Sequence, residues 1–313
     1  MTWLLWRQYR AAAFVTGAIV AIFAVAVLLT GVHMSHVYND AIQTCTRNGT
    51  CDFVGNLFSG YGAIVDIVHL SIVLPVLLGV FLGATLIARE TENSTHILLW
   101  TQTVRRRSWL VTKIAIALGA TLAASAVVTA LVTWWSGTPN ALYGNRFEGA
   151  EFDTQNIVPI AYSLFAVALG IAAGALWRRT LPALATTVLV YIGVRLAVGV
   201  YARPHYMKAV SKSFPLDGPE SIPSGSWVRQ RAIVDPAGHS LGATLRVPSA
   251  CGGVPDTKGA AISCLNHLGY RNVVTYQPPS HYWNFQWIEA GLFVVLAAAL
   301  VGFAILYTLR RDA

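Results

Sequence analysis

Six long apolar runs constrain the fold of this chain more than any other feature of its sequence. Each holds roughly the 20 apolar residues that a helix needs to cross a hydrocarbon core of about 30 Å. Because lipid offers no partner to backbone N–H and C=O groups, each run must be helical, and none alternates as a barrel strand does. We predict an all-α integral membrane protein with six transmembrane helices. They fall at residues 12–32, 61–87, 114–135, 157–176, 181–202 and 287–309.

Charged residues are scarce, and their distribution predicts how the helices are oriented. Hydrophobic residues make up 55% of the 313 positions and charged residues 12%, a balance unusual for a soluble domain of this length. Eleven Lys and Arg residues fall in short loops on one side of the predicted helices, against two opposite, Arg47 and Arg146. The eleven are Arg7, Arg10, Arg89, Arg105, Arg106, Arg107, Lys113, Arg178, Arg179, Arg310 and Arg311. This bias predicts a multi-pass protein of the plasma membrane with both termini cytoplasmic. The net charge of +8 then reflects topology and needs no nucleic-acid partner.

The four cysteines all fall in segments that this topology places outside the cytoplasm. They are Cys45, Cys51, Cys251 and Cys264. An even count in an oxidising compartment suggests two disulfides. Pairing Cys45 with Cys51 and Cys251 with Cys264 is the simplest of the three connectivities. A zinc site, with His267 as a further ligand, is the alternative, although neither spacing resembles C-x2-C.

One long segment, 203–286, lies outside the predicted membrane helices. It is rich in proline and glycine and contains two short β-prone pieces, SWVRQRAIVD and RNVVTYQ. We expect a small, disulfide-pinned extracytoplasmic domain between helices five and six. The chain would then consist of residues 1–202 with five helices, this domain, and residues 287–313 with the sixth helix and a cytoplasmic tail.

The first ten residues, MTWLLWRQYR, combine aromatic, aliphatic and basic side chains. This pattern is typical of a helix that lies in the cytoplasmic membrane interface, with its rings at headgroup level. An aromatic belt that simply begins the first transmembrane helix has the same composition. The residues alone leave both interpretations open.

Motifs for nucleotide binding and hydrolysis are absent from the sequence. There is no G-x-x-x-x-G-K-[ST] to cradle phosphates, no H-E-x-x-H and no G-x-S-x-G. We therefore predict that the chain is not an enzyme and binds no cofactor of its own. If it moves a substrate uphill, either a partner subunit binds ATP and Mg²⁺ or an ion gradient drives the movement.

The connector at residues 88–109, ARETENSTHILLWTQTVRRRSW, is unlike the apolar runs on either side of it. Glu90 and Glu92 lie at the start of a short predicted helix and residues 105–107 at its end, which matches the helix dipole at both ends. Residues 97–100 form an apolar knob between them. A soluble partner could grip such a helix. Alternatively, the arginines anchor the chain by the positive-inside rule and the knob lies on lipid.

The same connector resembles the signature of the permease subunits of ABC-2-type transporters. The actinobacterial group of these permeases has R-E-x-E-x-x-T-x-x-L-x-W-T-Q followed by R-x-x-W. The matching residues are Arg89, Glu90, Glu92, Thr95, Leu98, Trp100, Thr101, Gln102, Arg106 and Trp109. The start, WLLWRQYR, and the end, YQPPSHYWNFQWIEAGLF, are similar to W-x-x-W-R-Q-x-R and Y-Q-P-x-x-x-x-W-x-F-Q-x-I-E of the same group.

This resemblance implies a six-helix permease that pairs with a second copy or a sister permease and docks two ATPase subunits, which bind the ATP and Mg²⁺. The function implied is ATP-driven export of an unidentified substrate, such as a drug, a lipid-like molecule or a peptide. The ATPase-coupling residues would be Glu90, Glu92, Thr95, Leu98, Trp100, Gln102 and Arg106. A membrane sensor or signalling subunit, with a ligand-binding outer domain and no transport, is the alternative function.

Charged residues also occur within the predicted membrane helices. Asp66 lies in helix two with His69 one turn later, Arg195 in helix five and Glu289 at the outer start of helix six. Charges at such depth are costly and usually face protein or water and form pairs. Asp66 and Arg195 both fall in the outer half of their helices, so we expect them to be able to pair. Snorkelling to the interface, or substrate or proton handling, are the alternatives.

Overall fold

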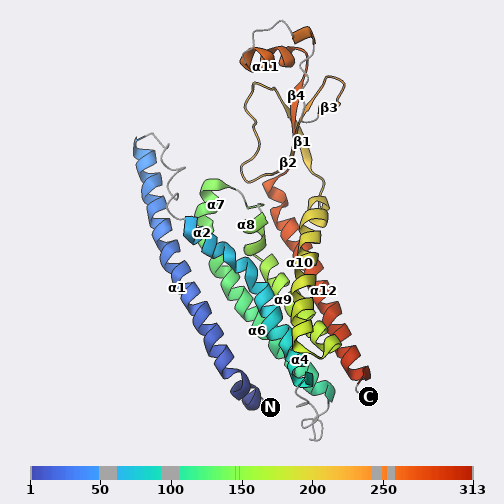
Figure 1. Ribbon diagram of the computed structural model, residues 1–313. Helices are drawn as coiled ribbons and strands as arrows, with labels where there is room; N and C mark the ends of the chain where they lie inside the picture. Colours follow the sequence, from blue (N-terminus) through green and yellow to red (C-terminus); the bar gives the residue numbers. More distant parts are fainter. Residues whose placement is uncertain are drawn as a thin grey trace. The chain divides into compact units, whose positions relative to one another are not determined.

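The computed structural model of the chain describes residues 2–48, 62–92, 106–144, 146–147, 149–241, 249–251 and 258–311. Within these residues, six helices are long and apolar enough to span a membrane (Figure 1). They are Val20–Arg47, Gly62–Arg89, Arg107–Trp135, Val158–Trp177, Thr180–His205 and Pro279–Arg311. The six predicted runs therefore correspond to six candidate membrane-spanning helices among the described residues.

The chain divides into two compact units, which we call the helical unit and the sheet unit. The helical unit comprises Met1–Tyr143, Gly149–Pro204 and Gln286–Ala313. The sheet unit comprises Gly144–Glu148 and His205–Phe285. The short piece from the loop between the third and fourth spans is an addition to the domain that we expected at residues 203–286.

The helical unit contains one helix that is longer than expected. α1 runs from Thr2 to Asn48, 47 residues, which corresponds to about 70 Å at 1.5 Å per residue. It is more than twice as long as a hydrocarbon core of about 30 Å is thick. The sequence left open whether the first ten residues form a separate interfacial helix or begin the first span. The structure continues a single helix through both segments.

The second span departs from regular α-helix around Pro75. It consists of α2 (Gly62–His69), a 3₁₀ turn (Leu70–Val73), α3 (Leu74–Leu78), a π-helical turn η4 (Gly79–Ala84) and α4 (Thr85–Glu92). Proline has no N–H to donate within a helix, and irregular turns commonly accompany it. The regular α-helix of this span is therefore interrupted between α2 and α4.

The remaining helices and turns of the helical unit include α9, which is the central one. They are α6 (Arg106–Trp135), α7 (Gly137–Tyr143), α8 (Gly149–Thr154), α9 (Val158–Trp177), α10 (Thr180–Ala197), a π-helical turn η5 (Val198–Ala202), a 3₁₀ turn (Arg203–His205) and α12 (Tyr282–Arg311). In α9, 78% of the most apolar window is buried inside this chain, against 17% in the spans of α1, α10 and α12. α9 is thus enclosed by protein, while those three spans leave most of their surface to lipid or to a partner.

The sheet unit is built on four antiparallel strands in the order β1-β4-β2-β3. They are β1 (Val210–Phe214), β2 (Trp227–Val234), β3 (Ser240–Leu241) and β4 (Arg271–Gln277), with α11 at Lys258–His267. β2 and β4 coincide with the two pieces predicted from β-prone composition. The core residues of the sheet are Phe214, Val274 and Tyr276, with Ile222 and Val228 packed against them.

Phe147 explains why residues 144–148 belong to the sheet unit. Its ring, only 3% exposed, packs edge-on against Tyr282 and Phe285 and stacks on Trp227 at a centroid distance of 6.1 Å. Aromatic contacts of this kind add about 0.5–1.5 kcal/mol each beyond the area they bury. A single side chain from a distant loop therefore completes an aromatic cluster in this unit.

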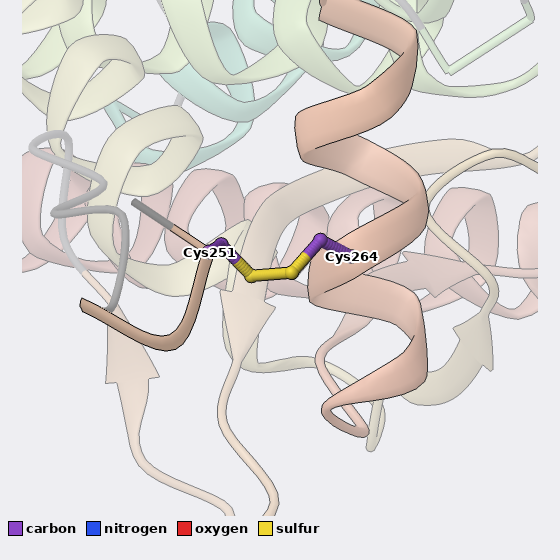
Figure 2. Close-up of a disulfide and its surroundings, with 2 residues drawn as sticks. All are labelled: Cys251 and Cys264. Atoms are coloured by element: carbon purple, nitrogen blue, oxygen red, sulfur yellow. A yellow bond between two sulfur atoms is a disulfide. The ribbon is translucent and has the colours of Figure 1, made fainter. Parts of the chain in front are cut away.

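A disulfide joins Cys251 to Cys264, with a Cα–Cα distance of 6.0 Å (Figure 2). It links the 3₁₀ turn Ser249–Cys251 to α11, and it confirms the predicted pairing of these two cysteines in place of the zinc alternative. Cys45 is also disulfide-bonded, while its predicted partner Cys51 lies outside the described residues.

Thiol labelling in the unfolded protein should reproduce this pairing. Without reductant, maleimide should leave Cys251 and Cys264 unmodified, and after reduction both should be labelled, as counted by peptide mass mapping. The Cys251→Ser variant is the control, since it should expose Cys264 to labelling without reductant. Labelling of Cys251 in the unreduced wild-type protein would contradict the disulfide.

Candidate functional site

Most of the predicted ATPase-coupling residues lie outside the part of the chain that the structure describes. Thr95, Leu98, Trp100 and Gln102 fall in the undescribed segment 93–105, and no side-chain position is described for Glu90 or Arg106. α4 ends at Glu92 and α6 begins at Arg106. The described structure thus fixes the two ends of the connector and leaves its middle as a prediction.

Glu92 makes a specific contact at the end of α4. Its carboxylate accepts hydrogen bonds from the backbone N–H and the hydroxyl of Thr180, at 2.9 and 2.6 Å. The hydroxyl bond, followed by the N–H bond, holds the pKa of the Glu92 carboxyl below its usual range, and Arg179 acts in the same direction. Because the N-cap residue Arg179 provides no side-chain cap, Glu92 supplies the acceptor at the start of α10.

This contact joins two loops that the sequence analysis treated separately. Glu92 ends the second span, and Thr180 follows the turn between the fourth and fifth spans. Both loops therefore lie at the same end of the helical unit and are linked through one carboxylate. No sequence signal could have shown this, because the two residues are 88 positions apart.

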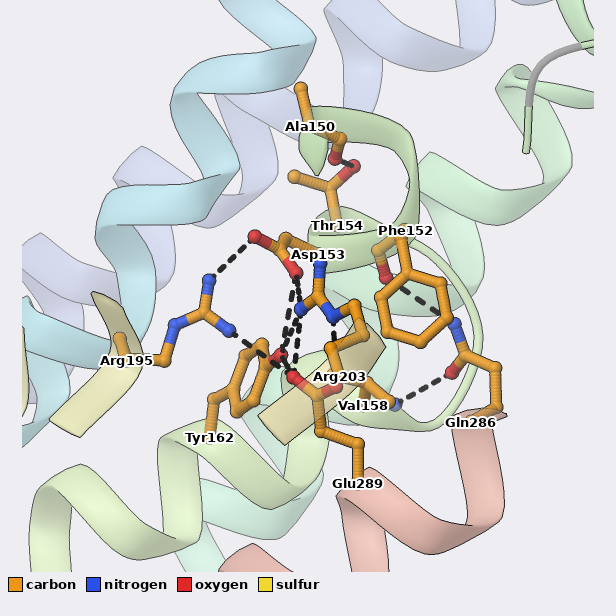
Figure 3. A network of polar contacts seen from close by, with 10 residues as sticks. All are labelled: Ala150, Phe152, Asp153, Thr154, Val158, Tyr162, Arg195, Arg203, Gln286 and Glu289. Carbon is orange, nitrogen blue, oxygen red and sulfur yellow. Dashed lines mark hydrogen bonds and ion pairs between the residues drawn. The ribbon is translucent and has the colours of Figure 1, made fainter. Parts of the chain in front are cut away.

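Five charged or polar side chains meet in a buried network inside the helical unit (Figure 3). They are Asp153 of α8, Tyr162 of α9, Arg195 of α10, Arg203 of the following 3₁₀ turn and Glu289 of α12. Arg195 Nη2 lies 2.7 Å from Asp153 Oδ2. Arg203 donates from Nε and Nη2 to the two Glu289 oxygens, at 2.9 and 2.7 Å, and from Nη2 to Asp153. The Tyr162 hydroxyl contacts Glu289 and Asp153.

The two guanidinium groups of the network also lie on aromatic rings. Arg195 is 3.6 Å from the centroid of Tyr162, and Arg203 is 4.3 Å from that of Phe152. Arg203 is only 6% exposed and Glu289 is fully buried. Two arginines and two acids balance one another, so the network buries four charges with no net charge. Desolvating each ion costs several kcal/mol, which only such close pairing can offset.

Gln286 of α12 fixes the backbone beside this network. Its side-chain oxygen accepts the N–H of Val158 at 3.1 Å, and its amide donates to the carbonyl of Phe152 at 3.3 Å. Phe152 lies in α8, which carries Asp153, and Val158 is the first residue of α9. The side chain of one helix therefore satisfies backbone groups that the turn between α8 and α9 leaves unpaired.

The expected pair between Asp66 and Arg195 is wrong. Arg195 pairs with Asp153, while Asp66 is exposed on α2 and makes no ion pair among the described residues. The reason is that the loop before the fourth span folds back as α8 and delivers its own acids. His69 likewise contacts Glu151 of α8, at 3.2 Å. Two acids directly before an apolar run were the available signal, and the sequence analysis considered only charges inside the runs.

Most residues of the network, and the Glu92–Thr180 contact, belong to the first five spans and the loops between them. A comparison with known protein families matches the same part of the chain. Residues 17–203 match the ABC-2 membrane transporter related family. The match covers more than half of the 313 residues. The chain belongs to this family. The resemblance found in the connector is thereby confirmed. No curated protein and no solved structure matches the chain.

As an ABC-2-type permease, the chain is a multi-pass membrane protein and a transport component, and permeases of this family normally work with ABC ATPase partners. The matched range includes Asp153, Tyr162, Arg195 and Arg203 and ends before α12, which carries Glu289. Among the described residues, no group of three His, Cys, Asp or Glu side chains could hold a metal ion. The acids and arginines of the network neutralise one another and join α8 to α10, to the following 3₁₀ turn and to α12.

Proposed function

We propose that this permease is the membrane-spanning subunit of an ABC exporter, with its termini in the cytoplasm. Two ATPase subunits would bind ATP and Mg²⁺ on that side, and a second copy of this chain or a sister permease would complete the transport path. The family match over residues 17–203 carries the proposal. The direction of transport rests on the resemblance to a group that consists mostly of exporters, and the substrate is unidentified.

In this proposal the connector 88–109 transmits the movement of the ATPases to the spans. When ATP closes the ATPase dimer, the connector moves with it as a lever. Its candidate contact residues are Glu90, Glu92, Thr95, Leu98, Trp100, Gln102 and Arg106. For transport to follow, the substrate must bind the two arrangements of the spans with different affinity.

The described ends of the connector support its role as a lever. Leu86 and Ile87 of α4, just before the connector, and Leu110 and Ile114 of α6, just after it, belong to a single buried apolar cluster. Ile171 of α9 lies in the same cluster. Because closely packed apolar side chains move together, force on the connector would reach the second, third and fourth spans at once. The Glu92–Thr180 contact would carry the same movement to α10.

Replacement of Trp100 by alanine should weaken the association with the ATPase. A buried aromatic anchor in an interface is often worth about 2 kcal/mol or more, so a tagged Trp100→Ala permease should recover several-fold less ATPase on affinity purification. Trp134→Ala is the matched control, because this exposed tryptophan lies at the other end of α6 and should leave recovery unchanged. Equal recovery from both variants would remove the coupling role from residues 88–109.

The second candidate function is that of a sensor or signalling subunit, and two features of the sheet unit support it. That unit has its own apolar core and its own disulfide, as a ligand-binding module would. Recovery of an ATPase fits both candidates, whereas ATP-dependent uptake of a substrate into inverted vesicles fits only the exporter. A permease that is repeatedly purified with an envelope protein and no ATPase would shift the function to the sheet unit.

A further inference from the structure

The short helix α8 holds different spans on its two faces. Successive residues of a helix are about 100° apart, so Glu151 and Asp153 are about 200° apart and lie on opposite sides. Glu151 contacts His69 of the second span. Asp153 contacts Arg195 and Arg203 at the end of the fifth span. α8 is therefore a bridge across the helical unit between two spans that are far apart in sequence.

The two attachments of α8 differ in strength. On one face, Asp153 contacts two arginines, and the three side chains are only 7–13% exposed. On the other, one contact of 3.2 Å joins Glu151 to His69, whose side chains are 25% and 30% exposed. That contact is an ion pair only while the imidazole is protonated. The polar attachment of α8 to the fifth span is thus buried and made to two arginines, whereas its polar attachment to the second span is one partly exposed contact. Beside that contact, α8 packs on α2 and on the 3₁₀ turn Leu70–Val73 of the second span.

Further contacts fix α8 to the spans other than the second. Gln286 of α12 accepts from the backbone at Val158 and donates to Phe152. Directly after α8, the N–H of Asn156 donates to the Thr133 hydroxyl of α6 at 2.8 Å. If α2, the outer part of the second span, moved away about the irregular turns near Pro75, α8 would lose its contact with His69 and its packing on α2. It would keep its attachment to the third, fifth and sixth spans.

Stability alone does not account for this arrangement. Well-packed apolar side chains in place of a buried ion pair are often as stable or more stable, whereas charged groups fix one arrangement among alternatives. Transporters change between discrete arrangements of rigid spans, and such changes need contacts that are either made or broken. The His69–Glu151 contact can be broken while the contacts of Asp153 with Arg195 and Arg203 stay made.

We propose that α8 is a latch, which holds α2, the outer part of the second span, against the fifth and sixth spans in the present conformation and releases it at the His69–Glu151 contact. α8 then stays with the fifth and sixth spans through Asp153. In the proposed topology α8 lies on the outer side, so its release would open the helical unit toward the outside. The link to ATP turnover rests on the proposed function, whereas the latch itself does not.

A zinc bridge built into the latch tests this proposal. In the Glu151→His variant, the new imidazole would face His69. Two nitrogens bound to one tetrahedral Zn²⁺ lie about 3.4 Å apart, since each Zn–N bond is about 2.0–2.1 Å, and the native contact is 3.2 Å. At a Zn²⁺ concentration about 100 times the dissociation constant of the bridge, the latched state is favoured about 100-fold.

In the purified complex of permease and ATPase, Zn²⁺ should lower the ATP turnover of Glu151→His at least several-fold. EDTA in slight excess over Zn²⁺, with Mg²⁺ kept in large excess over EDTA, should restore it. The variants Glu151→Ala and His69→Ala/Glu151→His each lack one of the two ligands, because carboxylates as well as imidazoles bind Zn²⁺. The same Zn²⁺ should therefore leave the turnover of both variants unchanged. Zn²⁺ that is retained by Glu151→His without slowing turnover would overturn the latch and leave the exporter proposal standing.

A distance measurement tests the latch without any ATPase. Ile67 of α2 and Leu196 of α10 are 53% and 62% exposed, and spin labels on cysteines at these positions report the separation of the two spans. The described native cysteines are all disulfide-bonded, so the labels attach to the introduced thiols. A second, longer distance that Zn²⁺ abolishes in Glu151→His supports the latch. A single distance under all conditions, or two that Zn²⁺ does not change, overturns it, whether or not an ATPase is recovered.

Discussion

Replacing Arg203 by methionine should lower the free energy of unfolding of the helical unit by about 3–5 kcal/mol, the usual cost of removing one partner from a buried ion pair. Arg203 donates three of its hydrogen bonds to Glu289 and Asp153. Without it, the Glu289 carboxyl is left at a fully buried position without its closest partner, and the nearest nitrogen of Arg195 is 4.0 Å away. Unfolding by SDS titration in dodecyl maltoside, followed by tryptophan fluorescence, measures the change.

Two further variants separate the effect of the charge from that of the side chain. Arg203→Met/Glu289→Met removes both charges, so it should cost clearly less than the sum of the single variants. Arg231→Met is the matched control at an exposed pair, since Arg231 is 58% exposed beside Glu220, and such pairs contribute about 1 kcal/mol or less. A cost for Arg203→Met no larger than that for Arg231→Met would show that water reaches the network.

The features that could be predicted from the sequence are those that depend on neighbouring residues. Six runs of apolar residues became six candidate spans, because crossing a membrane depends mainly on local length and hydropathy. β2 and β4 also followed from local composition. The Cys251–Cys264 disulfide closes over a separation of only 13 residues, and the nearest pairing in the sequence was therefore a sound prediction.

The features that could not be predicted depend on how separate segments meet. Asp66, Asp153 and Glu289 all lie in or next to predicted spans. The pairing of Arg195 with Asp153 follows from the folding back of α8. Phe147 joins the sheet unit only because three aromatic rings from two other segments surround it. Neither hydropathy nor spacing carries this information, which arises only once the spans are packed.

Replacing Gly170 by alanine should also destabilise the helical unit strongly, because the second span packs closely on α9 at this residue. A Cβ added there would lie 2.3 Å from the Gly79 carbonyl oxygen and 2.6 Å from the backbone nitrogen of Ala84. Both are backbone atoms of η4, so no side chain can rotate away, and the two spans would have to separate. We expect Gly170→Ala to lose about 3 kcal/mol in the SDS titration, the upper end of the usual overpacking cost.

Gly193→Ala on α10 is the matched control, because a Cβ there meets nothing within 4 Å. It should keep or slightly raise the stability, since alanine favours a helix by about 1 kcal/mol over glycine. Equal effects of the two substitutions would mean that the spans do not approach as closely as the structure has them. If Gly170→Ala is the harmful one, its remaining folded fraction should also couple poorly to the ATPase. η4 leads directly into α4, and a displaced α4 would carry Glu92 away from Thr180.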